Sequence, residues 1–135
     1  MNEAQTINFE LVSPEEKLIS QAVDWAVVPG DEGDMGVGAG HAPIISSLRP
    51  GVVELISGGQ SVQKVFIAGG FADISAVNCT VLAEEAIEVK NLDVEALSQE
   101  LSNLKEDLTL AVEEADKARI ERKLNVVEAK LQAAA

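Results

Sequence analysis

Short apolar runs alternate with polar residues over the first 90 residues of the chain, and turn residues separate these runs. Ile7, Phe9 and Leu11 alternate with polar neighbours, which is typical of a half-buried strand. The segment 18–28 is interpreted as two short strands or one bent strand. Further strands are expected at 52–56, 62–68, 71–77, 77–81 and 87–90. Many short strands separated by turns favour an antiparallel sandwich or barrel over a parallel βαβ sheet.

The period of the apolar residues changes after Asn91. A first apolar stripe, with spacings of 3, 4, 3 and 4 residues, runs from Val94 to Leu108, and a second, with spacings of 4, 3 and 4, runs from Ile120 to Leu131. Such spacings are typical of amphipathic helices, and Asp93 is a suitable N-cap for the first one. Neither Gly nor Pro separates the stripes. We expect a helical hairpin, with one long helix as the alternative.

These two patterns together predict the fold class and its division into domains. We expect an N-terminal β-sandwich of about ten short antiparallel strands over residues 1–90. A C-terminal α-helical hairpin follows over residues 91–135. Each helical stripe is narrow, so it needs the other helix, the sandwich or a partner to bury its apolar face.

A glycine-rich segment, residues 28–43, interrupts the strands. It holds five glycines and two prolines in sixteen residues, with apolar runs on both sides. Such a segment predicts a shaped loop held between strands rather than a flexible linker. Its tip is acidic, with Asp31, Glu32 and Asp34, and it ends at Gly40-His41-Ala42-Pro43.

The motifs of this segment resemble the signature of the epsilon subunit of bacterial F-type ATP synthases, which is equivalent to the mitochondrial delta subunit. The matching motifs are Val28-Pro-Gly30, Glu32-Gly-Asp-Met-Gly-Val37 and Gly40-His-Ala-Pro-Ile44. The resemblance continues, in the same order, through residues 48–53, 69–71 and 78–84. It covers most of residues 5–90.

The resemblance implies a part of a rotary machine. In that family the sandwich links the gamma subunit to the ring of c subunits, and the subunit is not itself an enzyme. Asp31, Glu32, Asp34 and Met35 would then face the c ring, and His41 would lie nearer gamma or shape its loop. Three further residues resemble those that meet the catalytic alpha and beta subunits when the hairpin extends: Arg119, Arg122 and Lys123. Whether the hairpin regulates ATP hydrolysis stays open.

Charge and composition restrict the partners and the location. The net charge is −13, which argues against binding to nucleic acid or to anionic lipid. Residues 117–135 nevertheless carry five basic and two acidic groups, a local charge of +3. We expect no insertion into the membrane, because no apolar run reaches about 18 residues. The N-terminus does not resemble a transit peptide, which favours a peripheral protein on the cytoplasmic side of a bacterial inner membrane.

Candidate chemistry is sparse. The glycines of residues 36–40 lack the spacing of a dinucleotide-binding motif, and no P-loop lysine is present. His41 is the only histidine, so we expect neither a metal site nor a catalytic group there, and we expect no cofactor. We interpret His41 as bonding to backbone groups of its loop. A small sandwich enzyme that uses His41 is one alternative, and a generic adaptor that acts through its helices is another.

The family comparison also concerns ATP. Some bacterial members of the family hold ATP through a motif of Ile or Leu, Asp, two variable residues, Arg and Ala at the start of the hairpin. Here Leu92 and Asp93 agree with that motif, but Ala96 stands where the arginine is expected. A phosphate would lose a bidentate charged partner, so we expect weak ATP binding or none.

Overall fold

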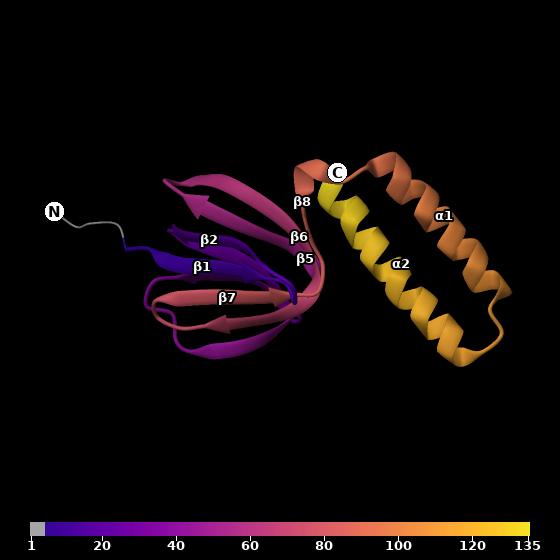
Figure 1. Ribbon diagram of the computed structural model, residues 1–135, viewed down its shortest axis with the longest axis horizontal. Helices are drawn as coiled ribbons and strands as arrows, with labels where there is room; N and C mark the ends of the chain where they lie inside the picture. Colours follow the sequence, from indigo (N-terminus) through magenta and orange to yellow (C-terminus); the bar gives the residue numbers. More distant parts are fainter. Residues whose placement is uncertain (1–4) are drawn as a thin grey trace. The chain divides into compact units, whose positions relative to one another are not determined.

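A computed structural model describes residues 5–135 of the protein. Its internal contacts divide the chain into two compact units, one ending at Glu88 and the other beginning at Val89 (Figure 1). The strands of the first unit are β1 (Ile7–Val12), β2 (Lys17–Val23), β3 (Trp25–Gly30), β4 (Gly33–Gly38), β5 (Ile44–Ser57), β6 (Gln60–Ile74), β7 (Asn78–Ala83) and β8 (Ala86–Glu88). The second unit holds η1 (Val89–Asn91), α1 (Val94–Leu110) and α2 (Glu114–Ala134).

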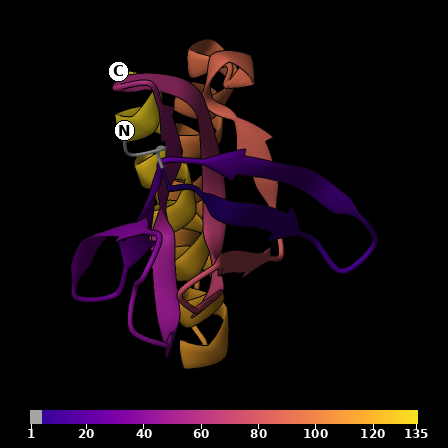
Figure 2. The ribbon, with the colours of Figure 1, turned by 90° about the vertical axis from the view of Figure 1, so that its left-hand side faces the viewer.

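The strands follow the order β2-β1-β7-β6-β5-β3-β4, and β8 pairs with β6. In Figure 2 the β1–β2 hairpin, at one end of this order, lies at the right. The long strands β5 and β6 take part in both layers of the sandwich. Residues 44–48 of β5 pair with residues 70–74 of β6, next to β7, whereas residues 54–56 of β5 pair with β3. The two strands therefore turn a corner between the pairs Leu48–Gly70 and Pro50–Ala68, next to Gly51 in β5 and Gly69 in β6.

Glycine is required at this corner. Gly70 has a φ of +146°, and a Cβ atom there would lie 1.9 Å from the carbonyl oxygen of Leu82. Any side chain would push β6 away from β7. The close approach of these two strands thus depends on one residue type.

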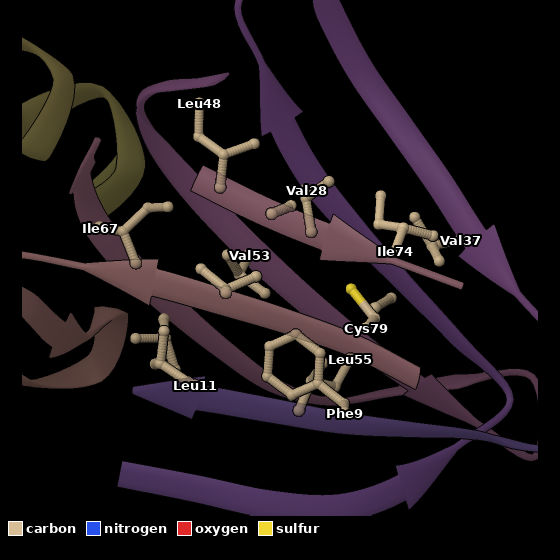
Figure 3. Packing of buried hydrophobic residues seen from close by; sticks show 14 of the residues in the cluster. Phe9, Leu11, Val28, Val37, Leu48, Val53, Leu55, Ile67, Ile74 and Cys79 are labelled. Carbon is tan, nitrogen blue, oxygen red and sulfur yellow. The ribbon is translucent and has the colours of Figure 1, made fainter. Parts of the chain in front are cut away.

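The core of the sandwich is aliphatic, with few aromatic rings (Figure 3). Ile7, Phe9 and Leu11 of β1 are at most 1% exposed, which confirms the predicted strand. No polar or charged side chain is buried in the described part of the chain. Burying each large side chain contributes roughly 1.5–3 kcal/mol, so this core is the main source of the unit's stability.

The glycine-rich segment is not the loop that we expected. β3 continues through Pro29-Gly30, and after a turn at residues 31 and 32 the segment returns as β4. The prediction was wrong because glycine in a strand also serves close packing. The indole ring of Trp25 covers Gly38, where a Cβ atom would lie 2.9 Å from the ring.

The sandwich class is confirmed, but its strands are fewer and longer than expected. Residues 5–135 hold eight strands rather than about ten. The predicted strands at 62–68 and 71–77 form the single strand β6, and β5 begins at Ile44 rather than near residue 52. Strand β1 also pairs with β7 in parallel, so the sheet is not wholly antiparallel. The segment 18–28 belongs to two strands, β2 and β3, which is one of the two interpretations given above.

The second unit is the expected helical hairpin. Leu97 and Leu104 of α1 are buried together with Ile120, Leu124 and Val127 of α2, which confirms both apolar stripes. The carboxylate of Asp93 accepts a hydrogen bond from the backbone nitrogen of Ala96 at 3.1 Å, as expected of an N-cap. Residues 111–113 connect the helices.

Candidate interaction surfaces

The acidic tip of the glycine-rich segment is the turn between β3 and β4. Asp31 and Glu32 form this turn and are exposed. Neither carboxylate makes a hydrogen bond or ion pair within residues 5–135. The backbone nitrogen of Asp31 donates to the carbonyl oxygen of Ser47 in β5 at 3.1 Å. The turn therefore presents two unpaired negative charges on a backbone that is tied to the neighbouring strand.

Asp34, the third acidic residue of the segment, is placed differently. It lies in β4, and its Oδ1 accepts a hydrogen bond from Nη2 of Arg49 at 2.5 Å. Nη1 of the same Arg49 donates to the carbonyl oxygen of Gly30 at 2.5 Å. The guanidinium group thus joins the two strands on either side of the turn.

Met35 follows in β4 and is partly buried against the sandwich core. Its side chain does not project with the carboxylates of the turn. A contact between Met35 and the c ring stays a prediction.

His41 lies beyond the other end of β4, so the length of this strand, roughly 20 Å, separates it from the acidic turn. Its Nδ1 donates to the carbonyl oxygen of Ala42 at 2.7 Å, and its backbone nitrogen donates to the carbonyl oxygen of Gly38 at 3.3 Å. Gly40, next to it, donates to the carbonyl oxygen of Ala76 at 2.8 Å. These bonds fit a residue that shapes its loop.

No catalytic arrangement surrounds His41 in the described part of the chain. The hydroxyl group of Ser46 donates to the carbonyl oxygen of Ser47, not to the imidazole ring. Within residues 5–135, no three His, Cys, Asp or Glu side chains gather as metal ligands. Burial raises the pKa of the Cys79 thiol to about 11, with Asp73 adding to the shift. A thiol of that pKa is a poor nucleophile at neutral pH.

An apolar groove on the outer side of the sheet was not expected from the sequence. It encloses about 500 Å³, and its lining includes Val12, Pro14, Ser47, Phe71, Leu82 and Glu84. Phe71 and Leu82 are direct cross-strand partners and are 55% and 49% exposed. Large apolar side chains that gather in one exposed place are typical of a binding surface. The alternation of β6 could have placed Phe71 outside, but only the register between β6 and β7 brings it to Leu82.

The groove continues along β5 toward His41. Ser47 pairs with Phe71 at the groove, and Ile45, two residues earlier in β5, therefore lies on the same outer face. Ile45 is 73% exposed. This strand connects the groove to the His41 loop, which ends just before Ile44.

The basic residues of the second unit lie together on α2. Arg119, Arg122 and Lys123 are all exposed, and spacings of three and four residues place them on one side of the helix. Arg119 bonds to Asp116 at 3.2 Å. Arg122 and Lys123 make no ion pair within residues 5–135, so their charges are open to a partner.

The chain is similar to known proteins over residues of both the sandwich and the helical hairpin. The family described as ATP synthase, Delta/Epsilon chain, beta-sandwich domain, matches residues 6–89. The ATP synthase epsilon chain of Rhodospirillum rubrum is 43% identical over 130 residues, which are 96% of this chain and 97% of the relative. The epsilon chain of Paramagnetospirillum magneticum is 47% identical over 132 residues, covering 98% of this chain and 99% of that one.

Two solved structures are similar to the chain. One is a chain of the Euglena gracilis mitochondrial ATP synthase, in a structure of OSCP, F1 and the c-ring, with a TM-score of 0.84. It is 28% identical, and the match covers 99% of this chain and 84% of the Euglena chain. The other is a chain of the central stalk and c-ring of the Tetrahymena thermophila enzyme, which is 15% identical with a TM-score of 0.72 and shares the fold.

Proposed function

The chain belongs to the family of ATP synthase delta and epsilon chains, and from this premise we propose that it is the central-stalk epsilon subunit of a proton-translocating F-type ATP synthase. The family resemblance inferred from the glycine-rich segment is thereby confirmed. The observation that carries the proposal is similarity over nearly the whole length of two named epsilon chains, across residues of both the sandwich and the hairpin.

In this role the subunit connects gamma to the ring of c subunits, so that rotation of the ring reaches the catalytic head. The unpaired carboxylates of Asp31 and Glu32 suit a contact with polar or basic loops of the ring. The charges of residues 5–88 also favour a contact with polar or basic loops. The three cations of these residues, Lys17, Arg49 and Lys64, each pair with a carboxylate, and the remaining nine acidic groups give the sandwich an acidic surface.

We assign the apolar groove and the neighbouring face of β5 to gamma. Phe71 and Leu82 offer an apolar centre, and Glu84 lies at the groove as a charged edge. Interfaces commonly combine an apolar centre with a polar rim. The same face leads through Ile45 to the His41 loop, so we extend the assignment to gamma to this loop as well.

The subunit acts without catalysis of its own in this proposal. The basic residues Arg119, Arg122 and Lys123 are available to an acidic segment of the alpha and beta subunits. No helix in the described residues is long and apolar enough to cross a membrane. We place the protein at the cytoplasmic side of a bacterial inner membrane, held there by its complex.

The test is a depletion and add-back experiment. ATP synthase is purified without this subunit, the recombinant full chain is added, and proton-coupled ATP synthesis is measured in vesicles. We expect coupling to return, with the added chain recovered together with gamma and the c ring. A chain that restores no coupling and binds neither partner would contradict the proposal and would favour the adaptor alternative.

A further inference from the structure

We infer that Arg49 is a positioning residue for the acidic turn, and that Asp34 serves as its anchor instead of contacting the c ring. This inference rests on the proposed function, because it concerns how the turn is held ready for the ring. It divides the three acidic residues of the segment into two, Asp31 and Glu32, that face the partner and one, Asp34, whose charge is paired within the chain by Arg49.

The contacts of Arg49 surround the turn. Its two terminal nitrogens donate to the carbonyl oxygen of Gly30 and to Oδ1 of Asp34, each at 2.5 Å. Gly30 is the last residue of β3, and Asp34 is the second residue of β4. The planar guanidinium group holds its donors in a fixed geometry, so one side chain holds both ends of the turn.

A brace is needed here because the sheet is irregular at this point. The pairing of β3 with β5 shifts between Val27 and Gly30. Pro29 lies within that interval and has no N–H group to donate. The backbone ladder that would hold β3 against β5 is thus interrupted just before the turn, and Arg49 makes its contacts at that interruption.

Because Arg49 pairs with Asp34 only, the three acidic residues of the segment differ in how their charges are matched. The charge of Asp34 is matched by Arg49, whereas Asp31 and Glu32 have no ion pair within residues 5–135. Their backbone is held on one side by Arg49 and on the other by the bond from Asp31 to Ser47. Preorganised charges bind with less loss of conformational freedom than mobile ones do.

The simpler interpretation is an ordinary surface ion pair, since both side chains are partly exposed, at 42% for Arg49 and 61% for Asp34. Such pairs usually contribute little to stability. The two interpretations differ in what happens to the turn when the pair is removed. A surface pair leaves the turn unchanged, and a brace does not.

The first measurement uses the isolated full chain. Amide hydrogen exchange at residues 31–35 is compared among Arg49→Met, Asp34→Ala and the unchanged protein. We expect exchange to accelerate about tenfold in both variants because the turn opens locally. Lys17→Met is the matched control, since it removes the 2.8 Å ion pair to Glu10 in the β1–β2 hairpin. Exchange at residues 31–35 that is equal in Arg49→Met and the unchanged protein would overturn the bracing.

The second measurement uses the reconstituted synthase and asks how tightly the catalytic head attaches to the c ring. We expect Arg49→Met and the double variant Asp31→Asn/Glu32→Gln each to weaken attachment by about tenfold. Combining all three changes should cause no further loss, because Arg49 acts only by placing those two carboxylates. If attachment in the triple variant is weakened by the product of the two separate losses, the inference is overturned.

The two measurements separate this inference from the proposed function. Faster exchange with unchanged attachment in every variant would overturn the ring contact and leave the bracing of the turn in place. A destabilised fold is recognised by the unfolding midpoint, which should be nearly equal in Arg49→Met and in the Lys17→Met control.

Discussion

Cys79 lies in the middle of the sandwich core, beside Phe9 in the neighbouring strand (Figure 3). Its thiol is fully buried, and its pKa is raised from 9.0 to about 11, chiefly by burial. The folded protein thus favours the protonated thiol, while the unfolded chain ionises near the ordinary pKa. The contribution of the protonated thiol to the stability of the fold is fully present below pH 9. It is lost as the pH rises toward about 11, because the unfolded chain then gains by ionising.

This pKa shift predicts a measurable loss of stability in alkali. Between pH 9 and 11 the free energy of unfolding should fall by about 2–3 kcal/mol more in the native sequence than in Cys79→Ala. Urea unfolding at a series of pH values measures the difference, and the chain holds no tyrosine to titrate in the same range. Parallel pH profiles for the two proteins would contradict the assignment.

Phe71 provides a second test at the scale of one residue. Replacing it with alanine should weaken binding to purified gamma by roughly 5- to 30-fold, because an aromatic side chain at the centre of an apolar surface often dominates binding. Val62→Ala is the matched control, since Val62 lies in the same strand, is 53% exposed and does not line the groove. Titration calorimetry gives both affinities. Equal losses in the two variants would mean that the groove is not the gamma site.

The strands and helices differ in how well their sequences predict them. The helices and β1 were predicted because their apolar periods are local and uninterrupted. The corner of β5 and β6 was missed because Pro50-Gly51 and Gly69-Gly70 have the composition of turns, although they bend continuous strands. The tie between Arg49 and Asp34 joins residues fifteen positions apart and depends on strand register, which composition does not reveal.

The start of α1 carries a prediction about ATP. Ala96 stands where the family resemblance leads us to expect the arginine of an ATP-binding motif, and its backbone nitrogen donates to the carboxylate of Asp93. Without the guanidinium, a charge-assisted contact of roughly 1.5–3 kcal/mol is missing, and Glu95 adds repulsion. We expect calorimetric titration of the full chain with ATP to give no saturable heat. Micromolar binding would show that another group replaces the arginine.

At the scale of the whole molecule, the division into two units predicts independent folding of the sandwich. Every member of its core cluster lies between Ile7 and Ala83, so a chain that ends at Lys90 keeps all of them. We expect this shortened chain to unfold in one cooperative thermal transition, followed by circular dichroism. A gradual, non-cooperative melt would mean that the hairpin is needed for the sandwich to fold.

The parallel pairing of β1 with β7 has a consequence for synthesis of the chain in the cell. β1 lies between β2 and β7, so its place in the sheet is complete only after Ala83 has been made. At about 5–20 residues per second, the ribosome needs roughly 4–15 s to go from Ile7 to that point. During this interval the apolar side chains of the β1–β2 hairpin have no sandwich to enter. The nascent chain therefore offers a target for chaperones that bind exposed apolar segments until β7 has been made.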